Sequence, residues 1–267
     1  MSQVPEPFSE EVLNALKDLS EKIKGRTEIS YDQMQDDNRY HISVIEKLGG
    51  YGWTIHGNIT PNDPREWINI IESKGEAEIL KWFSENDIDE MFDEMRHRYH
   101  TAPESLYLER ASENYYLGHY TEAAFFLLAL MNYRINIITP DNIHKLTKQC
   151  EEGLKKTGEE KYDSLSDHPI FRLFLVRDYI PSFYAFATRT FVDGDAHKFD
   201  AGTEPDYLNR NWLMHGRMTR LVKRYECVQL INAFHTLAEI EEAIDESTKT
   251  TESKSCLENN GEAGTVL

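Results

Sequence analysis

The sequence predicts an all-α protein, a helical bundle preceded by an N-terminal part that is also mainly helical. Three observations point to this class. Apolar residues recur at three- and four-residue spacing over most of the 267 residues, as they do on one face of a helix. Residues that start or stop helices flank several of these segments. The run 123–131 is apolar on every side, which is typical of a helix enclosed by other helices.

Residues 1–100 are expected to form an N-terminal helical region of unknown role. Residues 9–24 carry apolar side chains at helical spacing, and a glycine-rich break follows at 49–52. The stretch YGWTIHGNIT after this break could be a short extended piece. Asp63 and Pro64 form a helix-start signal, with Asp as N-cap and Pro as the first helical residue. Two acidic amphipathic segments follow, around 79–83 and 88–95.

A second domain is expected over residues 101–245, after a change of composition near Pro103. Glu104–Leu117 is expected to be a helix that ends at Gly118, and 121–138 is the apolar helix noted above. Residues 170–192 form another long apolar and aromatic segment, which Pro181 should kink or split. A loop is then expected over 193–202.

A new helix is expected to start at a capping box, Thr203–Asp206, and to stop at Gly216. A last helix follows, and residues 246–267 are expected to be a disordered tail because they lack apolar periodicity. The apolar residues that define the last helix are Val228, Leu230, Ile231, Phe234 and Leu237.

Charge and cysteine content limit the possible functions. The net charge of −18 repels phosphate, so any contact with nucleic acid must use a local basic patch. The three cysteines (Cys150, Cys227, Cys256) include no CxxC pair, which favours a reducing cytosol and no zinc site. The N-terminus lacks the pattern of a secretory signal, and the longest apolar run is too short to cross a bilayer. A cytoplasmic protein without a membrane segment is expected.

The ten residues LNRNWLMHGR carry the clearest chemical signal. On an ideal helix Asn211 and His215 share a face, and Arg210 lies next to it. Arginine binds phosphate through a planar fork, histidine transfers protons near neutral pH, and an asparagine amide can fix a histidine tautomer. These three residues could therefore bind a phosphodiester and move protons on it. Four more positive charges follow as a possible phosphate-tracking stripe: Arg217, Arg220, Lys223 and Arg224.

A simpler interpretation stands beside this one. A histidine in the last turn of a helix often only complements the helix dipole, and Arg and Asn often lie on a solvated face. A second alternative is a metal site around Glu94, His97 and His100. One Glu-x-x-His segment without a partner helix is not enough to hold a metal ion.

The same segment resembles the R-x4-6-H signature of the HEPN superfamily. Arg210, Asn211, His215 and Gly216 match the positions of the nuclease members, and Asn209 stands where Asn is frequent. The stretch SENYYLGHYTEAAFFLLALMNYRI is similar to the family's first core helix pair, and VQLINAFHTL is similar to the helix after the motif. The resemblance covers roughly residues 101–245.

This resemblance implies a HEPN-like helical bundle that forms a homodimer with a composite active site. It implies a metal-independent endoribonuclease of antiphage defence or a toxin–antitoxin system, without a cofactor. His215 would be the general acid or base in transesterification by the RNA 2′-hydroxyl, Arg210 would grip the phosphate, and Asn211 would orient His215 or contact the same phosphate. The remaining expected RNA-binding residues are Asn209, Arg217, Arg220, Lys223 and Arg224.

Some toxins of this group carry a Tyr two residues after the His, and a partner enzyme modifies it. Arg217 occupies that position here, which argues against this mode of silencing. Two alternatives remain: a non-catalytic module that binds RNA or nucleotide or only dimerises, and a toxin component neutralised by a separate antitoxin.

Overall fold

The fold is described by a computed structural model, which covers residues 31–55, 59–135, 175–192 and 204–261. Within this part of the chain 77% of the residues are helical and no strand occurs, so the all-α prediction is confirmed. The expected helix over 9–24 and the expected loop over 193–202 lie outside the described residues. None of the described helices combines the length and apolar character needed to cross a bilayer.

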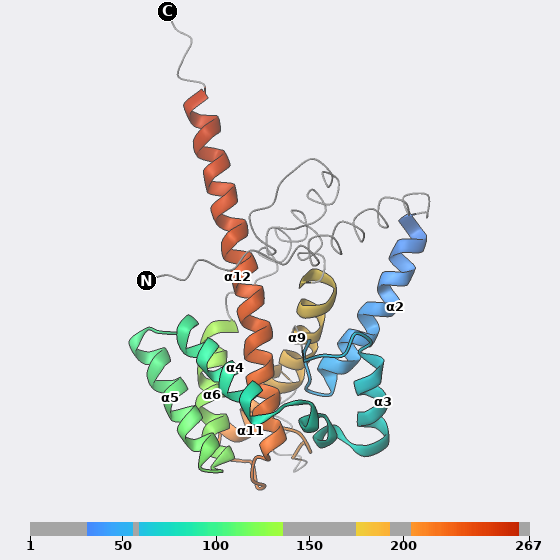
Figure 1. The fold of residues 1–267 in the computed structure, drawn as a ribbon, viewed down its shortest axis with the longest axis vertical. Helices are drawn as coiled ribbons and strands as arrows, with labels where there is room; N and C mark the ends of the chain where they lie inside the picture. Colours follow the sequence, from blue (N-terminus) through green and yellow to red (C-terminus); the bar gives the residue numbers. More distant parts are fainter. Residues whose placement is uncertain (1–30, 56–58, 136–174, 193–203, 262–267) are drawn as a thin grey trace, which may run out of the picture.

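The long helix α12 runs through the middle of the molecule (Figure 1). Helices α4, α5 and α6 lie on one side of it, and α2, α3 and α9 lie on the other. The bounds of the elements are α2 Tyr31–Gly50, α3 Arg65–Lys74, the 3₁₀ helix η1 Glu76–Trp82, α4 Glu85–Arg98, α5 Ala102–Tyr116, α6 Tyr120–Arg134, the π-helical turn η3 Leu175–Tyr179, α9 Ile180–Ala187, the π-helical turn η4 Thr188–Val192, α11 Arg210–Met214 and α12 Arg224–Gly261.

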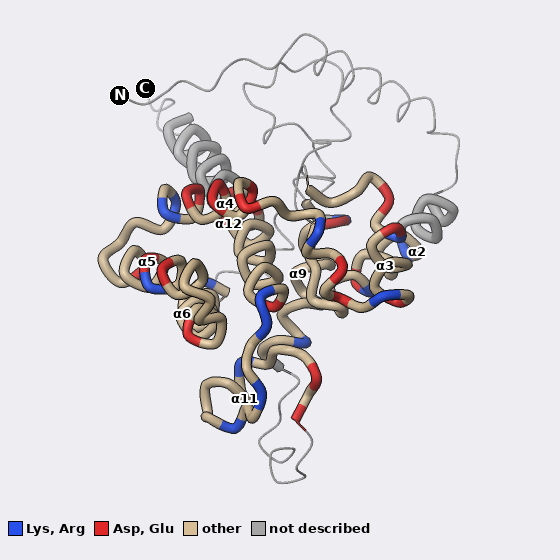
Figure 2. Tube along the Cα trace, turned by 60° about the horizontal axis from the view of Figure 1, so that its bottom comes forward, with Lys and Arg blue, Asp and Glu red and all other residues tan. Residues whose placement is uncertain are grey.

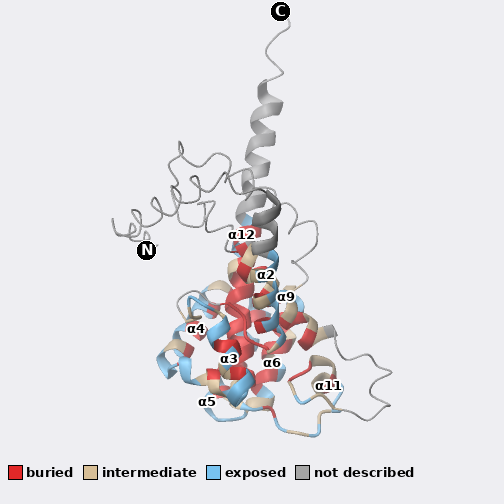
Figure 3. Cartoon of the chain, turned by 90° about the vertical axis from the view of Figure 1, so that its right-hand side faces the viewer, coloured by how far each residue is buried: buried red, intermediate tan, exposed pale blue. Residues whose placement is uncertain are grey.

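The predicted last helix is confirmed as the first half of α12, which is buried over most of its length between Cys227 and Ile244 (Figure 3). The helix does not stop where the disordered tail was expected, but continues over 246–261. Elongation from an already formed helix needs no new nucleation, so a polar sequence can extend it. Residues 262–267 lie outside the described part.

The predicted helix pair is present, with α5 beginning at Ala102 and α6 at Tyr120, while the expected last residues 136–138 lie outside the described part. Thr101 and Glu104 form a capping box at the start of α5, where the Thr101 hydroxyl donates to Glu104 Oε2 at 2.5 Å. Gly118 has φ = +76°, which ends α5 and returns the chain into α6. Helix α6 buries six apolar residues between Ala123 and Met131, but it is not enclosed on every side as predicted, because Phe125 is 42% exposed.

Pro181 divides the apolar segment as expected, because α9 begins at Ile180, directly after η3. Helix α2 packs closely against α9: a Cβ added at Gly49 would lie 2.1 Å from the Ser182 carbonyl oxygen. A glycine is therefore required at this crossing. The His41 ring and the buried Asp178 carboxylate join α2 to η3 as well.

The N-terminal elements follow their local signals with small differences. Helix α3 begins at Arg65, one residue later than expected, and Asp63 Oδ1 accepts from the Arg65 N–H at 3.0 Å. The stretch after Gly52 forms no strand over its described residues. Instead Thr54 is buried, and its carbonyl oxygen accepts from Asn232 Nδ2 of α12 at 2.9 Å.

Residues on both sides of position 100 share one hydrophobic core. Polar contacts join them too, since Tyr99 donates from its hydroxyl to Glu241 Oε2 of α12 at 2.9 Å. The sequence predicted a domain boundary near Pro103. However, buried residues of α4, before this position, and of α5, after it, belong to the same core. The described N-terminal elements thus help to bury α12.

Candidate functional site

The predicted site residues lie on α11, a helix of five residues that starts later than expected. The prediction that Thr203–Asp206 opens this helix is wrong, because residues 204–209 are not helical. Asn209 is the N-cap, and its Oδ1 accepts from the N–H groups of Asn211 at 3.0 Å and Trp212 at 3.3 Å. Glu204 has another role: its carboxylate accepts from the Thr219 N–H at 3.0 Å.

The end of α11 agrees with the prediction. His215 is the C-terminal cap residue, and its N–H donates to the Asn211 carbonyl at 3.1 Å. Gly216 follows with φ = +65°, a conformation that favours glycine. The chain therefore turns away at once, and the side chain of His215 is left exposed at the tip of the helix.

The structure brings Arg210 and Asn211 into direct contact. Arg210 Nη1 donates to Asn211 Oδ1 at 2.9 Å, and Asn211 Nδ2 donates to the Phe191 carbonyl at 3.3 Å. The Arg210 side chain is half-buried, and its Nε is enclosed without a protein acceptor. Asn211 thus fixes the guanidinium of Arg210, a contact that the sequence did not predict.

The turn η4 holds α11 in place through two carbonyl groups. Asn209 Nδ2 donates a hydrogen bond to the Arg189 carbonyl at 3.1 Å, and Asn211 Nδ2 donates one to the Phe191 carbonyl. Asn209 is fully buried, so in this structure its amide serves the helix cap and η4. Its expected contact with RNA stays a prediction that this arrangement does not favour.

The positive charges after the motif lie along the chain between α11 and the start of α12 (Figure 2), but some of them are paired with acidic residues. Arg220 donates from both terminal nitrogens to the buried Glu226, at 2.8 and 2.6 Å, and these bonds raise the pKa of its guanidinium. Arg224 pairs with Glu85 and donates to the Tyr115 hydroxyl at 3.0 Å. Arg217 and Lys223 are the exposed members of the expected stripe.

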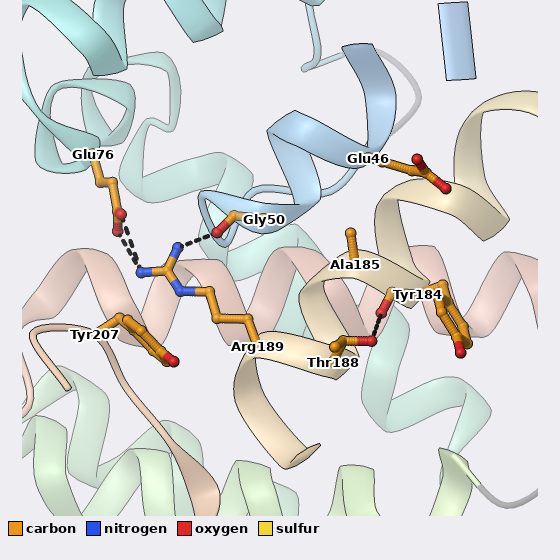
Figure 4. A pocket seen from close by; sticks show the side chains of 8 residues that line it. All are labelled: Glu46, Gly50, Glu76, Tyr184, Ala185, Thr188, Arg189 and Tyr207. Atoms are coloured by element: carbon orange, nitrogen blue, oxygen red, sulfur yellow. Dashed lines mark hydrogen bonds and ion pairs between the residues drawn. The ribbon is translucent and has the colours of Figure 1, made fainter. Parts of the chain in front are cut away.

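A cavity of about 520 Å³ lies beside Thr188 and Arg189 of η4 (Figure 4). Its wall includes Arg189, whose guanidinium lies 4.5 Å from the ring centroid of Tyr207. Tyr207 precedes Arg210 by three residues, so this cavity adjoins the segment that leads into α11. The complete lining is Glu46, Gly50, Glu76, Tyr184, Ala185, Thr188, Arg189 and Tyr207.

A second cavity, of about 460 Å³, contains part of the metal site considered from the sequence. Glu94 and His97 of α4 face His235 and Glu239 of α12, and His235 Nδ1 lies 3.1 Å from Glu94 Oε2. Burial raises the pKa of Glu239. However, no group of three His, Cys, Asp or Glu side chains among the described residues is placed to hold a metal ion.

No family model, characterised protein or solved structure matches the chain. The relation to the HEPN superfamily therefore remains an expectation carried by the Arg210-Asn211-His215 motif and its helical context.

The sequence did not indicate the residues that support the motif. Arg189 and Phe191 belong to the apolar and aromatic segment 170–192, whose pattern gave no sign of polar contacts, and Glu76 is 113 positions from the arginine that it binds. A contact between such distant positions depends on how the helices pack. Asn209, in contrast, is a preferred N-cap residue three positions before the apolar Trp212, and this signal could have located the start of α11.

Proposed function

We propose that the protein is a metal-independent endoribonuclease of HEPN type that acts in antiphage defence or a toxin–antitoxin system. The observation that carries the proposal is the arrangement on α11. At the start of this helix, Asn211 holds the guanidinium of Arg210. At its end, His215 is exposed, and the exposed Arg217 follows two residues later. This combination offers a cation for phosphate and a group for proton transfer.

In the proposed reaction the RNA 2′-hydroxyl attacks the adjacent phosphorus, and the bond to the 5′-oxygen breaks. His215 transfers a proton to or from these oxygens, and Arg210 stabilises the charge that develops on the phosphoryl oxygens. The products are a 2′,3′-cyclic phosphate and a 5′-hydroxyl. Arg210 is already oriented by Asn211, which reduces the reorganisation needed in the transition state.

We expect RNA cleavage to continue in excess EDTA and to yield 2′,3′-cyclic phosphate ends. A metal-dependent nuclease would instead take its nucleophile from metal-bound water. Purified protein is incubated with total RNA and with DNA of matched length, and the ends are identified by enzymatic phosphorylation and dephosphorylation. Activity that requires Mg²⁺ or Mn²⁺, leaves 5′-phosphate ends or also cuts DNA would contradict the mechanism.

A homodimer is part of this proposal, and the surface next to α11 suggests where the two copies meet. Leu221 is 80% exposed and Leu117 is 70% exposed. The Val222 N–H donates to Thr121 Oγ1 at 3.1 Å, which places Leu221 at the start of α6, one turn before the exposed Phe125. Exposed apolar side chains gathered in this way are typical of protein–protein interfaces.

We expect the wild type to sediment as a dimer and the double variant Leu221→Ser/Phe125→Ser to dissociate at least about 10-fold more readily, since central apolar contacts dominate interface energies. The matched control is Tyr133→Ser, which changes another exposed aromatic residue at the far end of α6. Analytical ultracentrifugation over a range of concentrations gives the result. A wild type that stays monomeric at tens of micromolar, an ordinary range for moderate affinity, would exclude the dimer.

A further inference from the structure

Arg189 is a buried charged residue that the proposed reaction does not use. Its side chain is only 10% exposed. Nη1 donates to the Gly50 carbonyl at 3.0 Å, and Nη2 donates to Glu76 Oε1 and Oε2 at 3.1 and 3.0 Å (Figure 4). The guanidinium is therefore tied to the end of α2 and to the start of η1 at the same time. Its face lies against the ring of Tyr207.

The backbone of the same residue holds the motif. The Arg189 carbonyl accepts from Asn209, and the Phe191 carbonyl accepts from Asn211. In a π-helical turn the regular hydrogen-bond pattern of an α-helix is interrupted, and such turns often occur at functional sites. The carbonyl groups of η4 thus receive side-chain donors from the segment 209–211. The position of α11 depends on the position of these carbonyl groups.

A continuous set of contacts consequently joins the N-terminal elements to the motif. It begins at Glu76, passes through the side chain and then the backbone of Arg189, and ends at the cap residue of α11. Gln229 of α12 adds contacts, since its Nε2 donates to the Tyr51 carbonyl at 3.0 Å, next to Gly50, and to Glu76 Oε2 at 3.4 Å. Glu76 and Arg189 are therefore held by three neighbouring elements and have little freedom to move.

We propose that Arg189, fixed by Glu76, is a positioning residue that sets the orientation of Arg210 and His215. The described residues before position 100 then have a role: η1 and the end of α2 hold the turn that holds α11. A catalytic group must stay close to its productive geometry, and a short capped helix cannot ensure this alone. The catalytic part of this inference rests on the proposed function, whereas the structural part can be measured without any activity.

The structural part is tested by hydrogen exchange in the whole protein. In Glu76→Gln the carboxylate charge is lost while the size is kept, so Arg189 loses its ion pair. We expect amide exchange over 207–216 to become roughly 10-fold faster, because local opening of α11 is no longer restrained. Exchange in α5 and α6 is expected to stay unchanged. The matched control is Glu78→Gln on the same 3₁₀ helix, whose carboxylate binds the exposed Lys81.

Equal exchange over 207–216 in Glu76→Gln and Glu78→Gln would overturn the proposal. A second variant separates positioning from stability. Glu76→Met/Arg189→Met removes both charges and leaves no unpaired one, so the melting temperature should recover toward that of the wild type. We expect fast exchange over 207–216 to persist in this double variant. Recovery of slow exchange together with stability would show that the ion pair only supports the fold, and would also overturn the proposal.

The catalytic part is tested with the same proteins. We expect Glu76→Gln and the double variant to lower kcat for RNA cleavage by roughly 10-fold or more with KM little changed, since the residues proposed to contact RNA are all present. A kcat equal to that of Glu78→Gln would overturn the positioning role. If the wild type cleaves no RNA, the proposed function fails, and the exchange measurement still decides whether Arg189 positions α11.

Discussion

Replacing His215 by alanine is expected to lower the rate of RNA cleavage by roughly 10²–10⁴-fold, the usual contribution of a general acid or base. His215 is exposed at the C-terminal cap of α11 and makes its backbone contact through its N–H, which alanine keeps. The backbone end of α11 should therefore be kept while the proton-transfer group is lost. The effect is measured on purified protein and as relief of growth inhibition in a bacterial host that expresses it.

Arg210→Ala should cause a loss of similar size, and Arg210→Lys should recover only part of it. A lysine keeps the charge, but it lacks the fork that binds phosphate and Asn211 together. The control is His100→Ala, which removes an exposed histidine of the alternative metal site that the sequence suggested around Glu94. Equal cleavage and equal toxicity of wild type and His215→Ala, at equal protein level, would rule out the nuclease assignment and favour a non-catalytic binding module.

Arg134→Met is expected to have the largest effect on stability, a loss of about 3–5 kcal/mol, because it leaves two buried carboxylates without their cation. Arg134 Nε and Nη2 each donate to Glu241 at 3.0 Å, and Nη1 donates to Glu104 at 3.2 Å. The side chains of Glu241 and Glu104 are 3% and 6% exposed. Denaturant unfolding measures the change. The control is Arg110→Met, whose partner Glu113 is exposed and should matter little.

The same variant should show a distinct pH dependence. Burial raises the pKa of Glu241 above its usual 4.5, although the hydrogen bonds from Arg134 and Tyr99 oppose the shift. An acid whose pKa is raised in the folded state binds protons more tightly there than in the unfolded state. Its contribution to stability is therefore full below about pH 4.5 and falls as pH rises through the folded-state pKa.

Loss of Arg134 removes one of the groups that opposed this shift. The gap in stability between Arg134→Met and the wild type should thus be widest near neutral pH and should narrow as pH falls toward 4.5, because protonation of Glu241 removes the unpaired buried charge. A gap that stays constant between these values would mean that lost packing of the arginine stem, and not the buried carboxylates, causes the destabilisation.

Local signals determined the helices that the sequence predicted well. The end of α5 at Gly118, the division at Pro181 and the stop at Gly216 each depend on the sterics and hydrogen bonds of a few adjacent residues. The apolar periodicity of α12 likewise depends only on the geometry of one helix. For this reason the all-α class and the place of the Arg210-Asn211-His215 motif near a helix end could be derived from the sequence.

Tertiary packing decided which of the polar residues remain available. The stripe after the motif looked uniformly basic, yet Arg224 pairs with Glu85, 139 positions away, and Arg220 turns onto the buried Glu226. Glu204 looked like part of a capping box but binds the loop at Thr219 instead. Charges pair with whatever the folded chain brings within a few ångströms, because buried ions must be compensated. The spacing of residues along the chain does not predict such neighbours. The contacts that join Glu76 through Arg189 to α11 could therefore be identified only from the tertiary structure.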